Sequence, residues 1–332
     1  MKRVLVTGAT SGLGRNAVET LLKQGVEVLA VGRRGAIGEE LEAMGAQYAH
    51  LNLVLTPRRH LAALADGCDA VWHCAALSSP WGKETAFYLI NVEATRRLAE
   101  SALEAGVKRF VHISTPAIYF DFKHHYDVRE DFRAAQYVNH YAATKARGER
   151  EVLEVAEKGL HVSILRPRAI FGEHDQVLLP RLLRLLNEKD GKLILPRGGR
   201  TVLDMTYVGN VVHAMQLATT RTDLASGEIF NITNGEPLPV AEVLKALFIR
   251  ELGRKMRIWS LPYPLLAGIA RVMEAKAERE NVEPKLTRYS VGALAYDMTL
   301  DISRARGLLG YAPPVTMDQG IIRTGAWLKA HP

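Results

Sequence analysis

The chain has 332 residues, 48% of them hydrophobic, and carries 43 Lys and Arg against 36 Asp and Glu, a formal net charge of +7. A chain of this length buries enough apolar surface to fold without disulfides or a structural metal, which excludes small disulfide-bonded scaffolds. The basic residues are scattered and interleaved with acids, whereas nucleic-acid-binding surfaces usually cluster them, so no nucleic-acid partner is expected. The positive excess instead favours an anionic small molecule.

The sequence lacks the usual signals of a membrane or secreted protein. Its longest uncharged stretch covers only residues 205–220, whereas a spanning helix needs about 20 mostly apolar residues. Strand-like sequence begins at Arg3, which leaves no room for a signal peptide. Cys68 and Cys74 are the only cysteines and have no neighbouring metal ligands. We therefore expect a cytoplasmic protein with reduced thiols and no metal site.

Short β-branched and apolar runs alternate with amphipathic helical segments through the first half of the chain, a pattern typical of a parallel sheet covered by helices. Helices are predicted over residues 12–24, 87–105 and 141–158. Strands are predicted near residues 3–7, 27–32, 47–52, 70–75, 109–114, 161–166 and 229–233. Seven such strands predict an α/β fold with a doubly wound parallel Rossmann sheet.

After about residue 170, prolines and glycines interrupt this regular rhythm. We expect a dinucleotide-binding domain over residues 1–170 and mainly a smaller substrate lobe over residues 171–332, with the strand at 229–233 returning to the sheet. The apolar segment 260–273 is read as a helix that packs in the core or between the lobes. A substrate-lining or membrane-contacting surface is its alternative.

A glycine-rich turn lies between the first strand and the first helix. Glycines there allow a tight turn and a close approach to a pyrophosphate, which sits at the positive end of the helix dipole. The predicted cofactor-binding residues of this segment are Gly8, Thr10, Ser11, Gly12, Leu13, Gly14 and Arg15.

The second strand ends in Arg33-Arg34, at the place where a carboxylate would bind the ribose 2′-hydroxyl of NAD. Guanidinium groups suit a 2′-phosphate because they offer forked donors and a permanent charge. NADP(H) is therefore the preferred cofactor and NAD(H) a possible one. The alternative interpretation is a pair of solvated surface arginines.

Several further motifs follow in a recognisable order: His73-Cys74-Ala75-Ala76, Asn91, Ser114-Thr115, Tyr141-Ala142-Ala143-Thr144-Lys145 and Leu165-Arg166-Pro167. With the glycine turn, they make the chain resemble an extended short-chain dehydrogenase/reductase, nearest to 3β-hydroxysteroid dehydrogenases, dihydroflavonol reductases and 2-alkyl-3-oxoalkanoate reductases. The resemblance implies a homodimer built on the helices at 87–105 and 141–158. It also implies further cofactor contacts at Asn52, Leu53, Ala75, Ala76, Asn91, Ser114, Tyr141, Lys145 and Pro167.

The sequence departs from the family pattern at two places. The spacing of Gly8, Gly12 and Gly14 is that of single-domain members. Asn52 stands where an adenine-binding Asp is common in the family.

Tyr141 and Lys145 lie four residues apart and therefore on one helical face. A free phenol has a pKa near 10, so a nearby ammonium that favours phenolate would help it exchange a proton with a carbonyl or alcohol oxygen. The resemblance makes Tyr141 the general acid and Lys145 the residue that holds the nicotinamide ribose. Thr115, four residues before Tyr119, is the expected catalytic hydroxyl, with Ser114 as the alternative.

Other candidate residues are less specific. Asn91 either supports the cofactor and the neighbouring segments or is a buried amide within a helix. Arg166 either lies near the cofactor or forms a structural salt bridge. His124-His125 lacks a third ligand and is read as a solvated loop. The candidate substrate residues are Ser79, Trp81, Phe120 and Arg166.

The preferred function is an NADP(H)-dependent oxidoreductase that moves hydride between nicotinamide and a carbonyl or hydroxyl of a fairly apolar small molecule: a ketone, aldehyde, 3-oxo acid or steroid. A sugar-nucleotide epimerase or dehydratase is the alternative enzyme. Dehydratases of the family usually place Asp-Glu after the catalytic Thr, whereas Pro116-Ala117 follows Thr115 here. A non-catalytic NADP-binding regulator is the alternative of another class, and such proteins typically lose the Tyr and Lys that this chain keeps.

Overall fold

Seven parallel strands form the central sheet of the molecule, in the order β12-β7-β5-β4-β1-β2-β3. The computed structural model describes residues 1–176 and 179–331. The strands are β1 (Arg3–Thr7), β2 (Glu27–Gly32), β3 (Gln47–His50), β4 (Ala70–His73), β5 (Arg109–Ile113), β7 (Val162–Pro167) and β12 (Glu228–Ile232). The predicted doubly wound α/β sheet is confirmed, and each predicted strand lies within two residues of its observed bounds.

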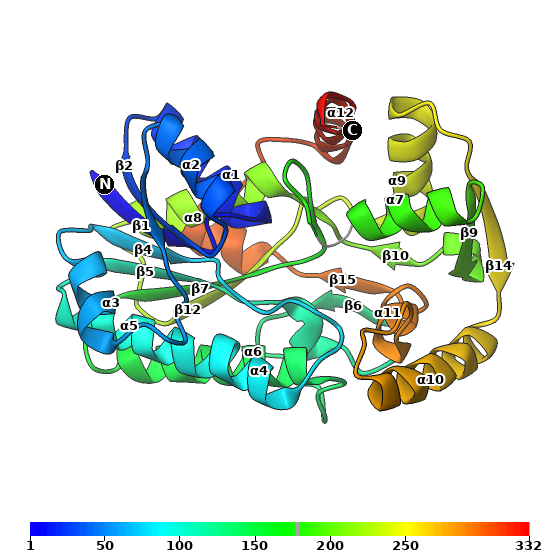
Figure 1. The fold of residues 1–332 in the computed structure, drawn as a ribbon, viewed down its shortest axis with the longest axis horizontal. Helices are drawn as coiled ribbons and strands as arrows, with labels where there is room; N and C mark the ends of the chain where they lie inside the picture. Colours follow the sequence, from blue (N-terminus) through cyan, green and yellow to red (C-terminus); the bar gives the residue numbers. More distant parts are fainter. Residues whose placement is uncertain (177–178, 332) are drawn as a thin grey trace.

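Helices cover both faces of this sheet because its inner strands carry apolar side chains on both sides (Figure 1). One face packs against α1 (Gly12–Lys23) and α8 (Val208–Thr220). The other packs against α3 (Arg58–Ala65), α5 (Ala94–Glu104) and α6 (His140–Ala156). A further helix, α2 (Gly35–Ala43), lies against β3.

The helix predicted over residues 87–105 is divided into three parts. It begins as α4 (Glu84–Tyr88), passes through a π-helical segment, η1 (Leu89–Glu93), and continues as α5. The carbonyl of Asn91 in η1 lies so close to Gly148 of α6 that a Cβ at Gly148 would stand 2.4 Å from its oxygen. This close contact joins the widened turn to the helix that carries Tyr141 and Lys145.

The second lobe has its own core and three small sheets. Its strands are β6 (His125–Val128), β8 (Ile170–Phe171), β9 (Lys192–Pro196), β10 (Val202–Leu203), β11 (Thr206–Tyr207), β13 (Leu238–Pro239), β14 (Arg257–Leu261) and β15 (Met298–Leu300). Its helices are α7 (Leu179–Glu188), α9 (Val240–Lys245), α10 (Tyr263–Glu280), α11 (Arg288–Ala293) and α12 (Met317–Ala330). The chain also forms four short helical segments: η2 (Pro116–Tyr119), η3 (Arg197–Gly199), η4 (Ala246–Glu251) and η5 (Ala305–Leu309).

The chain crosses between the lobes more than once. Strand β6 precedes residue 170 yet pairs with β15 in the second lobe, whereas α8 and β12 follow residue 170 and pack into the first. Segments on both sides of residue 170 therefore contribute to both lobes.

The apolar segment 260–273 lies mainly in α10. One side of this helix is buried through Leu266 and Ala270, whereas Leu265 and Val272 are exposed. Within the described residues, no helix is both long enough and apolar enough to cross a membrane.

Candidate active site

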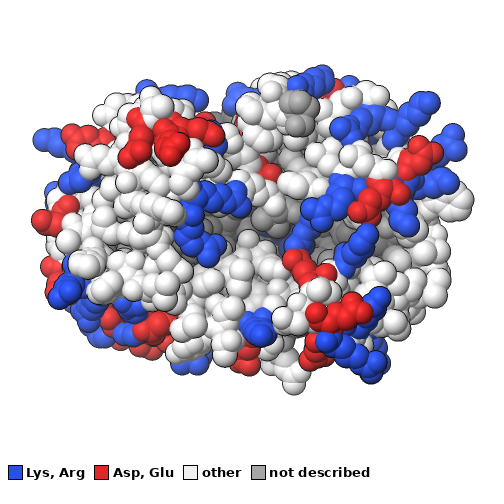
Figure 2. Space-filling view, in the orientation of Figure 1, with Lys and Arg blue, Asp and Glu red and all other residues white. Residues whose placement is uncertain are grey.

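A cavity of about 550 Å³ lies between the lobes, at the carboxyl ends of β1, β2, β4, β5 and β7. In open parallel sheets this edge is where ligands bind. Figure 2 shows the corresponding hollow, with Lys and Arg side chains on both sides of it. The predicted cofactor residues that line the cavity are Gly8, Thr10, Ser11, Gly12, Leu13, Gly14, Arg33, Arg34, Asn52, Leu53, Ala75, Ala76, Ser114, Tyr141, Lys145 and Pro167.

The glycine turn is built so that no side chain fills its cradle. Gly8 has φ +68°, and a Cβ there would stand 2.8 Å from the backbone nitrogen of Ala75. A Cβ at Gly14 would stand 2.2 Å from the carbonyl oxygen of Gly8. Larger residues at either position would force the turn apart, so the start of α1 stays open for the diphosphate of a dinucleotide.

The end of β2 places two exposed arginines at the cavity. Arg34 donates to the amide oxygen of Gln176 at 2.5 Å, and both Arg33 and Arg34 line the cavity wall. Thr10 packs against Gly32, where a Cβ would meet its side chain at 2.4 Å. The strand end is therefore held close to the glycine turn, with guanidinium groups next to it.

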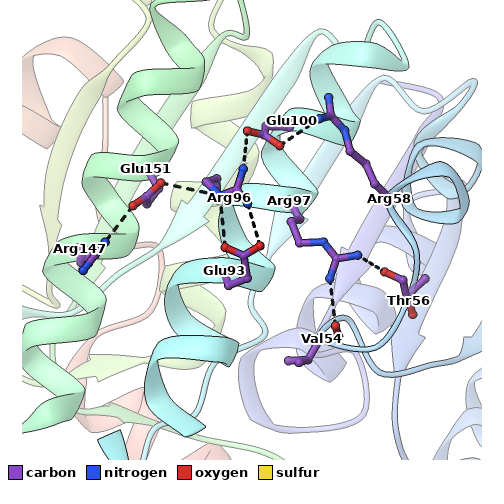
Figure 3. Close-up of polar contacts among 9 residues, drawn as sticks. All are labelled: Val54, Thr56, Arg58, Glu93, Arg96, Arg97, Glu100, Arg147 and Glu151. Atoms are coloured by element: carbon purple, nitrogen blue, oxygen red, sulfur yellow. Dashed lines mark hydrogen bonds and ion pairs between the residues drawn. The ribbon is translucent and has the colours of Figure 1, made fainter. Parts of the chain in front are cut away.

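The segment after β3 forms the wall next to these arginines. Asn52 accepts a hydrogen bond from its neighbour Val54 N–H at 3.0 Å and so closes a local turn. Arg97 of α5 donates to the backbone oxygen of Val54 at 2.9 Å and also to that of Thr56 (Figure 3). Arg97 holds this segment in place, a role that the sequence pattern alone did not reveal.

Tyr141 lies in the first turn of α6. The helix start is fixed by Asn139, whose side chain accepts a hydrogen bond from Ala142 N–H at 2.8 Å. The Tyr141 hydroxyl forms a hydrogen bond with the hydroxyl of Thr115, which lowers its pKa, but burial outweighs this and raises the pKa of Tyr141 to about 12. Tyr141 is therefore protonated at neutral pH, the state that a proton donor requires.

Lys145 is buried one turn further along the same helix. Its ammonium donates to the backbone oxygen of Ile113 at 2.6 Å and lies 3.3 Å from Nε2 of His112. Burial lowers the pKa of Lys145 to about 8, against the opposing charges of Glu149 and Cys74. The ammonium thus lines the cavity, while its bond to the Ile113 oxygen of β5 holds it in position.

Ser114 and Thr115 both line the cavity but differ in their partners. The Thr115 oxygen accepts a hydrogen bond from Ala117 N–H at 3.1 Å in addition to its contact with Tyr141. The Ser114 hydroxyl is buried and has no hydrogen-bond partner among the described residues.

Asn91 does not line the cavity. Its amide bonds the backbone of Leu77 in both directions, at 2.8 and 3.2 Å, and reaches Thr144 of α6 at 3.2 Å. It thus ties the loop after β4 to the helix of Tyr141 and Lys145, and supports the cavity wall from behind.

Other predicted residues also lie outside the cavity lining. Arg15 pairs with Glu19 and Glu40. Phe120 is buried among Phe122, Tyr289 and Tyr296. Of the candidate substrate residues, only Ser79 lines the cavity, and Trp81 does not.

Arg166 is a structural residue in this fold. Its guanidinium is completely buried and pairs with Glu149 of α6. Nη1 also donates to the Tyr119 hydroxyl at 2.5 Å and to the Glu130 backbone oxygen at 2.9 Å, so all three guanidinium nitrogens are engaged within the protein.

The two neighbouring histidines have separate carboxylate partners. His124 lies 3.0 Å from Asp297, and His125 lies 2.7 Å from Asp121. Across the described residues, no group of three or more His, Cys, Asp or Glu side chains is placed to hold a metal ion.

Tyr289 and Ser290 line the cavity from α11 of the second lobe. Neither belongs to a motif, because they come to the site through the packing of α10 and α11 and not through sequence spacing. Burial raises the pKa of Tyr289, and the positive charge of Arg168 lowers it.

The residues present fit a nicotinamide dinucleotide. The glycine turn offers a cradle without side chains that would suit the diphosphate. The ends of β2 and β3 would face the adenosine, and Tyr141 and Lys145 line the same cavity. When bound, such a cofactor would supply or accept hydride.

The family model for NAD dependent epimerase/dehydratase proteins matches residues 4–233. A relative from Escherichia coli (strain K12), the "Uncharacterized protein YbjS", is 46% identical over 99% of this chain and 98% of its own. The 2-alkyl-3-oxoalkanoate reductase of Stenotrophomonas maltophilia is 31% identical over 98% of both chains. The solved UDP-glucuronic acid 4-epimerase of Bacillus cereus in complex with NAD shares the fold, with TM-score 0.78, 22% identity and coverage of 98% of this chain and 96% of that one.

Proposed function

The chain belongs to the NAD-dependent epimerase/dehydratase family of extended short-chain dehydrogenases/reductases, whose members include NAD(P)-dependent oxidoreductases. From this premise we propose that it is an NADP(H)-dependent reductase of fairly apolar ketones and 3-oxo acids. The observation that carries the proposal is the meeting of Thr115, Tyr141 and Lys145 at one cavity. The relative that acts on 2-alkyl-3-oxoalkanoates supports the substrate class.

In this reaction Tyr141 donates its phenolic proton to the carbonyl oxygen as hydride reaches the carbonyl carbon. Thr115, which is already hydrogen-bonded to Tyr141, donates a hydrogen bond to the carbonyl oxygen and stabilises the negative charge that develops on that oxygen. The ammonium of Lys145 favours the phenolate that Tyr141 becomes. Alcohol oxidation uses the same atoms in reverse.

Two features favour NADP(H) over NAD(H). Arg33 and Arg34 lie at the cavity, and the end of β2 carries no carboxylate to bind a free 2′-hydroxyl. Acidic residues follow only later, at Glu39 and Glu40 of α2, and Glu40 already pairs with Arg15.

A sugar-nucleotide epimerase or dehydratase is the second candidate, since the family name covers such enzymes. Against a dehydratase, Pro116 and Ala117 follow Thr115, where an additional acid and base would stand. An epimerase of this kind would keep NAD bound through the reaction. Arg33 and Arg34 at the end of β2 suit the 2′-phosphate of NADP instead, and therefore weigh against an epimerase.

We further propose a cytoplasmic homodimer that buries the outer faces of α4, η1 and α6. Leu89 is 43% exposed there, and Arg147 stacks on the Tyr88 ring at 5.0 Å. The nearby charges are paired with one another: Arg96 bonds Glu93 and Glu100 at 2.7 and 2.8 Å, Arg58 lies 3.3 Å from Glu100, and Arg147 lies 3.6 Å from Glu151 (Figure 3). Covering such a face costs less than covering unpaired charges, because each charge keeps a partner when water is removed.

The dimer is tested by the mass in solution. Leu89→Asp should convert a dimer into a monomer, because it places a carboxylate in the buried interface. Leu308→Asp on η5, where the leucine is 46% exposed, is the matched control and should leave the mass unchanged. A monomeric wild-type protein at micromolar concentration would contradict the proposal.

The reaction is tested by following NADPH oxidation with ketones, aldehydes, steroids and 3-oxo acids. Tyr141→Phe removes the proton but little volume, so turnover should fall at least roughly a hundredfold while NADPH binding persists. Tyr137→Phe, an exposed tyrosine outside the cavity, is the control. Full turnover in Tyr141→Phe would exclude the mechanism.

A further inference from the structure

A row of buried polar side chains crosses the middle of the central sheet and ends at Lys145. Thr7 of β1, His73 of β4 and His112 of β5 are paired neighbours in the strand register, and all three are at most 1% exposed. The Thr7 hydroxyl lies 2.7 Å from Nδ1 of His73, and the hydroxyl of Thr95 on α5 lies 2.9 Å from its Nε2. Both ring nitrogens of His73 therefore have partners.

His112 has a partner on one side only. Its ring stacks on the His73 ring with the centroids 5.4 Å apart, and its Nε2 lies 3.3 Å from Nζ of Lys145. An ammonium has donors and no acceptor, so Nε2 is the acceptor and the ring proton sits on Nδ1. That Nδ1 is buried and has no hydrogen-bond partner among the described residues. An apolar residue would avoid the cost of this unsatisfied donor, so the contact with Lys145 is what the imidazole supplies at this position.

The same contact fixes the direction of the Lys145 ammonium. One N–H donates to the Ile113 oxygen at 2.6 Å and a second to Nε2 of His112. Both acceptors belong to β5. An ammonium carries three donors, and Lys145 lines the cavity, so the third N–H is available to a molecule that binds there.

The surroundings of Lys145 keep both histidines neutral. Burial and the positive charge of Lys145 lower the pKa of His112 well below its ordinary value, and His73 lowers it further. Burial and Lys145 likewise lower the pKa of His73 to about 3. Neither ring gains a charge near neutral pH, so His112 can act as an acceptor throughout that range.

Three other titratable groups face or adjoin Lys145. Glu149 on α6 is already paired with Arg166. Cys74, after β4, and Tyr141, on α6, are both buried, which raises the pKa of each to about 12. Of the groups in this cluster, Lys145 with its pKa of about 8 is the one that titrates between about pH 6 and 10.

We propose that His112 is a positioning residue for Lys145: it holds one N–H of the ammonium, so that the N–H left over is directed at the cofactor in the cavity. This rests on the proposed function only in assigning a nicotinamide cofactor to that cavity. Without the acceptor, the ammonium loses a stabilising bond and its pKa falls further. It also loses its fixed direction, so the cofactor binds less tightly. A hydrogen bond to a charged group is strong enough for each effect to reach about tenfold.

The test follows the Kd of NADPH by fluorescence titration between about pH 6 and 10. Wild-type affinity should stay level up to about pH 8, the pKa of Lys145, and fall above it, because a neutral amine is a weaker donor than an ammonium. In His112→Leu the fall should begin about one pH unit lower, and the affinity should be about tenfold weaker even where the lysine is charged. His112→Gln keeps an acceptor at the end of its side chain and should recover most of both losses.

A matched control removes an imidazole elsewhere. His213 lies on α8, on the other face of the sheet, and does not line the cavity. His213→Leu should therefore bind NADPH as the wild type does at every pH. A Gln variant at His112 that behaves like the Leu variant would mean that the ring matters for packing and not as an acceptor, and would overturn the proposal.

NMR of the cofactor-free protein gives a readout that depends on neither binding nor turnover. The Cε resonance of Lys145 should titrate near pH 8 in the wild type and about one unit lower in His112→Leu. Histidine-labelled wild-type protein should show His112 as the neutral Nδ1–H tautomer at neutral pH. This last measurement needs no variant, so it decides even if His112→Leu does not fold: an Nε2–H tautomer could not accept from Lys145 and would overturn the proposal.

Two further results would overturn it. The first is an unchanged Lys145 titration in a folded His112→Leu protein, whatever its melting temperature. The second is a loss of NADPH affinity that is as large when His112→Leu is added to Lys145→Met as when it is made alone, since a residue that acts through Lys145 has no effect without it. The reductase assignment is judged separately. If these shifts occur but no carbonyl is reduced, that assignment fails and the role of His112 remains.

Discussion

Arg166 and Glu149 form a two-point ion pair inside the protein, with Nε–Oε1 at 2.8 Å and Nη2–Oε2 at 2.5 Å. Their side chains are only 0% and 6% exposed. Glu149 stands one turn after Lys145 on α6, and Arg166 lies near the end of β7. The pair therefore fixes the helix of Tyr141 and Lys145 to the sheet edge where a cofactor would lie.

Removing one member of this pair should destabilise the fold strongly. Arg166→Met leaves the Glu149 carboxylate buried without a partner, and we expect the free energy of unfolding in urea to fall by about 3–5 kcal/mol. The double variant Arg166→Met/Glu149→Leu should recover part of that loss, because no buried charge remains. Wild-type stability in Arg166→Met combined with lost activity would mean that Arg166 acts on a ligand instead.

The buried Lys145 should make stability depend on pH. Its pKa is about 8 in the folded protein against 10.5 for the free side chain, so between these values the unfolded chain binds more protons. The free energy of unfolding should therefore rise with pH across this window, by at most about 3 kcal/mol, and the penalty should be largest below pH 8.

Cys74 acts in the opposite direction, since burial raises its pKa to about 12. Lys145→Met isolates the lysine contribution, because the difference between its urea unfolding curve and that of the wild type removes the effect of other groups. We expect Lys145→Met to be more stable than the wild type at pH 7 and to approach it near pH 10. A difference that does not change with pH would contradict the burial of a titrating lysine.

The central sheet could be predicted from the sequence because local patterns determine it. Most of its strands carry a run of apolar residues, with β3 (Gln47–His50) the clearest exception, and the glycine turn marks the first crossing from strand to helix at Gly8–Gly14. Spacing also placed Tyr141 and Lys145 on one face. These features depend on residues close together in the chain.

What the sequence did not reveal depends on contacts between distant segments. Tyr289 reaches the cavity through the packing of α11 and does not lie in a spaced motif. Phe120 was expected in the pocket because it follows Thr115, but it packs against Phe122 and Tyr296 in the core of the second lobe. The sequence pattern around an aromatic residue near a strand end is the same whether its side chain faces a ligand or packs in a second lobe.

The cofactor preference is tested at the end of β2. Arg33→Ser/Arg34→Ser should weaken NADPH binding, because each charge-assisted bond to the 2′-phosphate contributes about 1.5–3 kcal/mol. The loss should reach at least roughly tenfold in Kd, while the Kd for NADH changes little. Fluorescence titrations of the wild type and the double variant with NADPH and with NADH measure these Kd values. Equal affinities of the wild type for NADPH and NADH would mean that the two arginines only face solvent.

Thr115 and Ser114 provide the sharpest test of the reaction. Both line the cavity, but Thr115 shares a hydrogen bond with Tyr141, whereas the Ser114 hydroxyl lacks any partner among the described residues. Thr115→Val keeps the shape and removes the donor, so kcat for a ketone with NADPH should fall about a hundredfold or more, the cost of losing a donor aimed at developing charge. Ser114→Ala should reduce kcat far less, since no bond in the structure depends on that hydroxyl. A larger loss in Ser114→Ala would transfer the catalytic role to Ser114, whose free hydroxyl would then turn to the substrate oxygen.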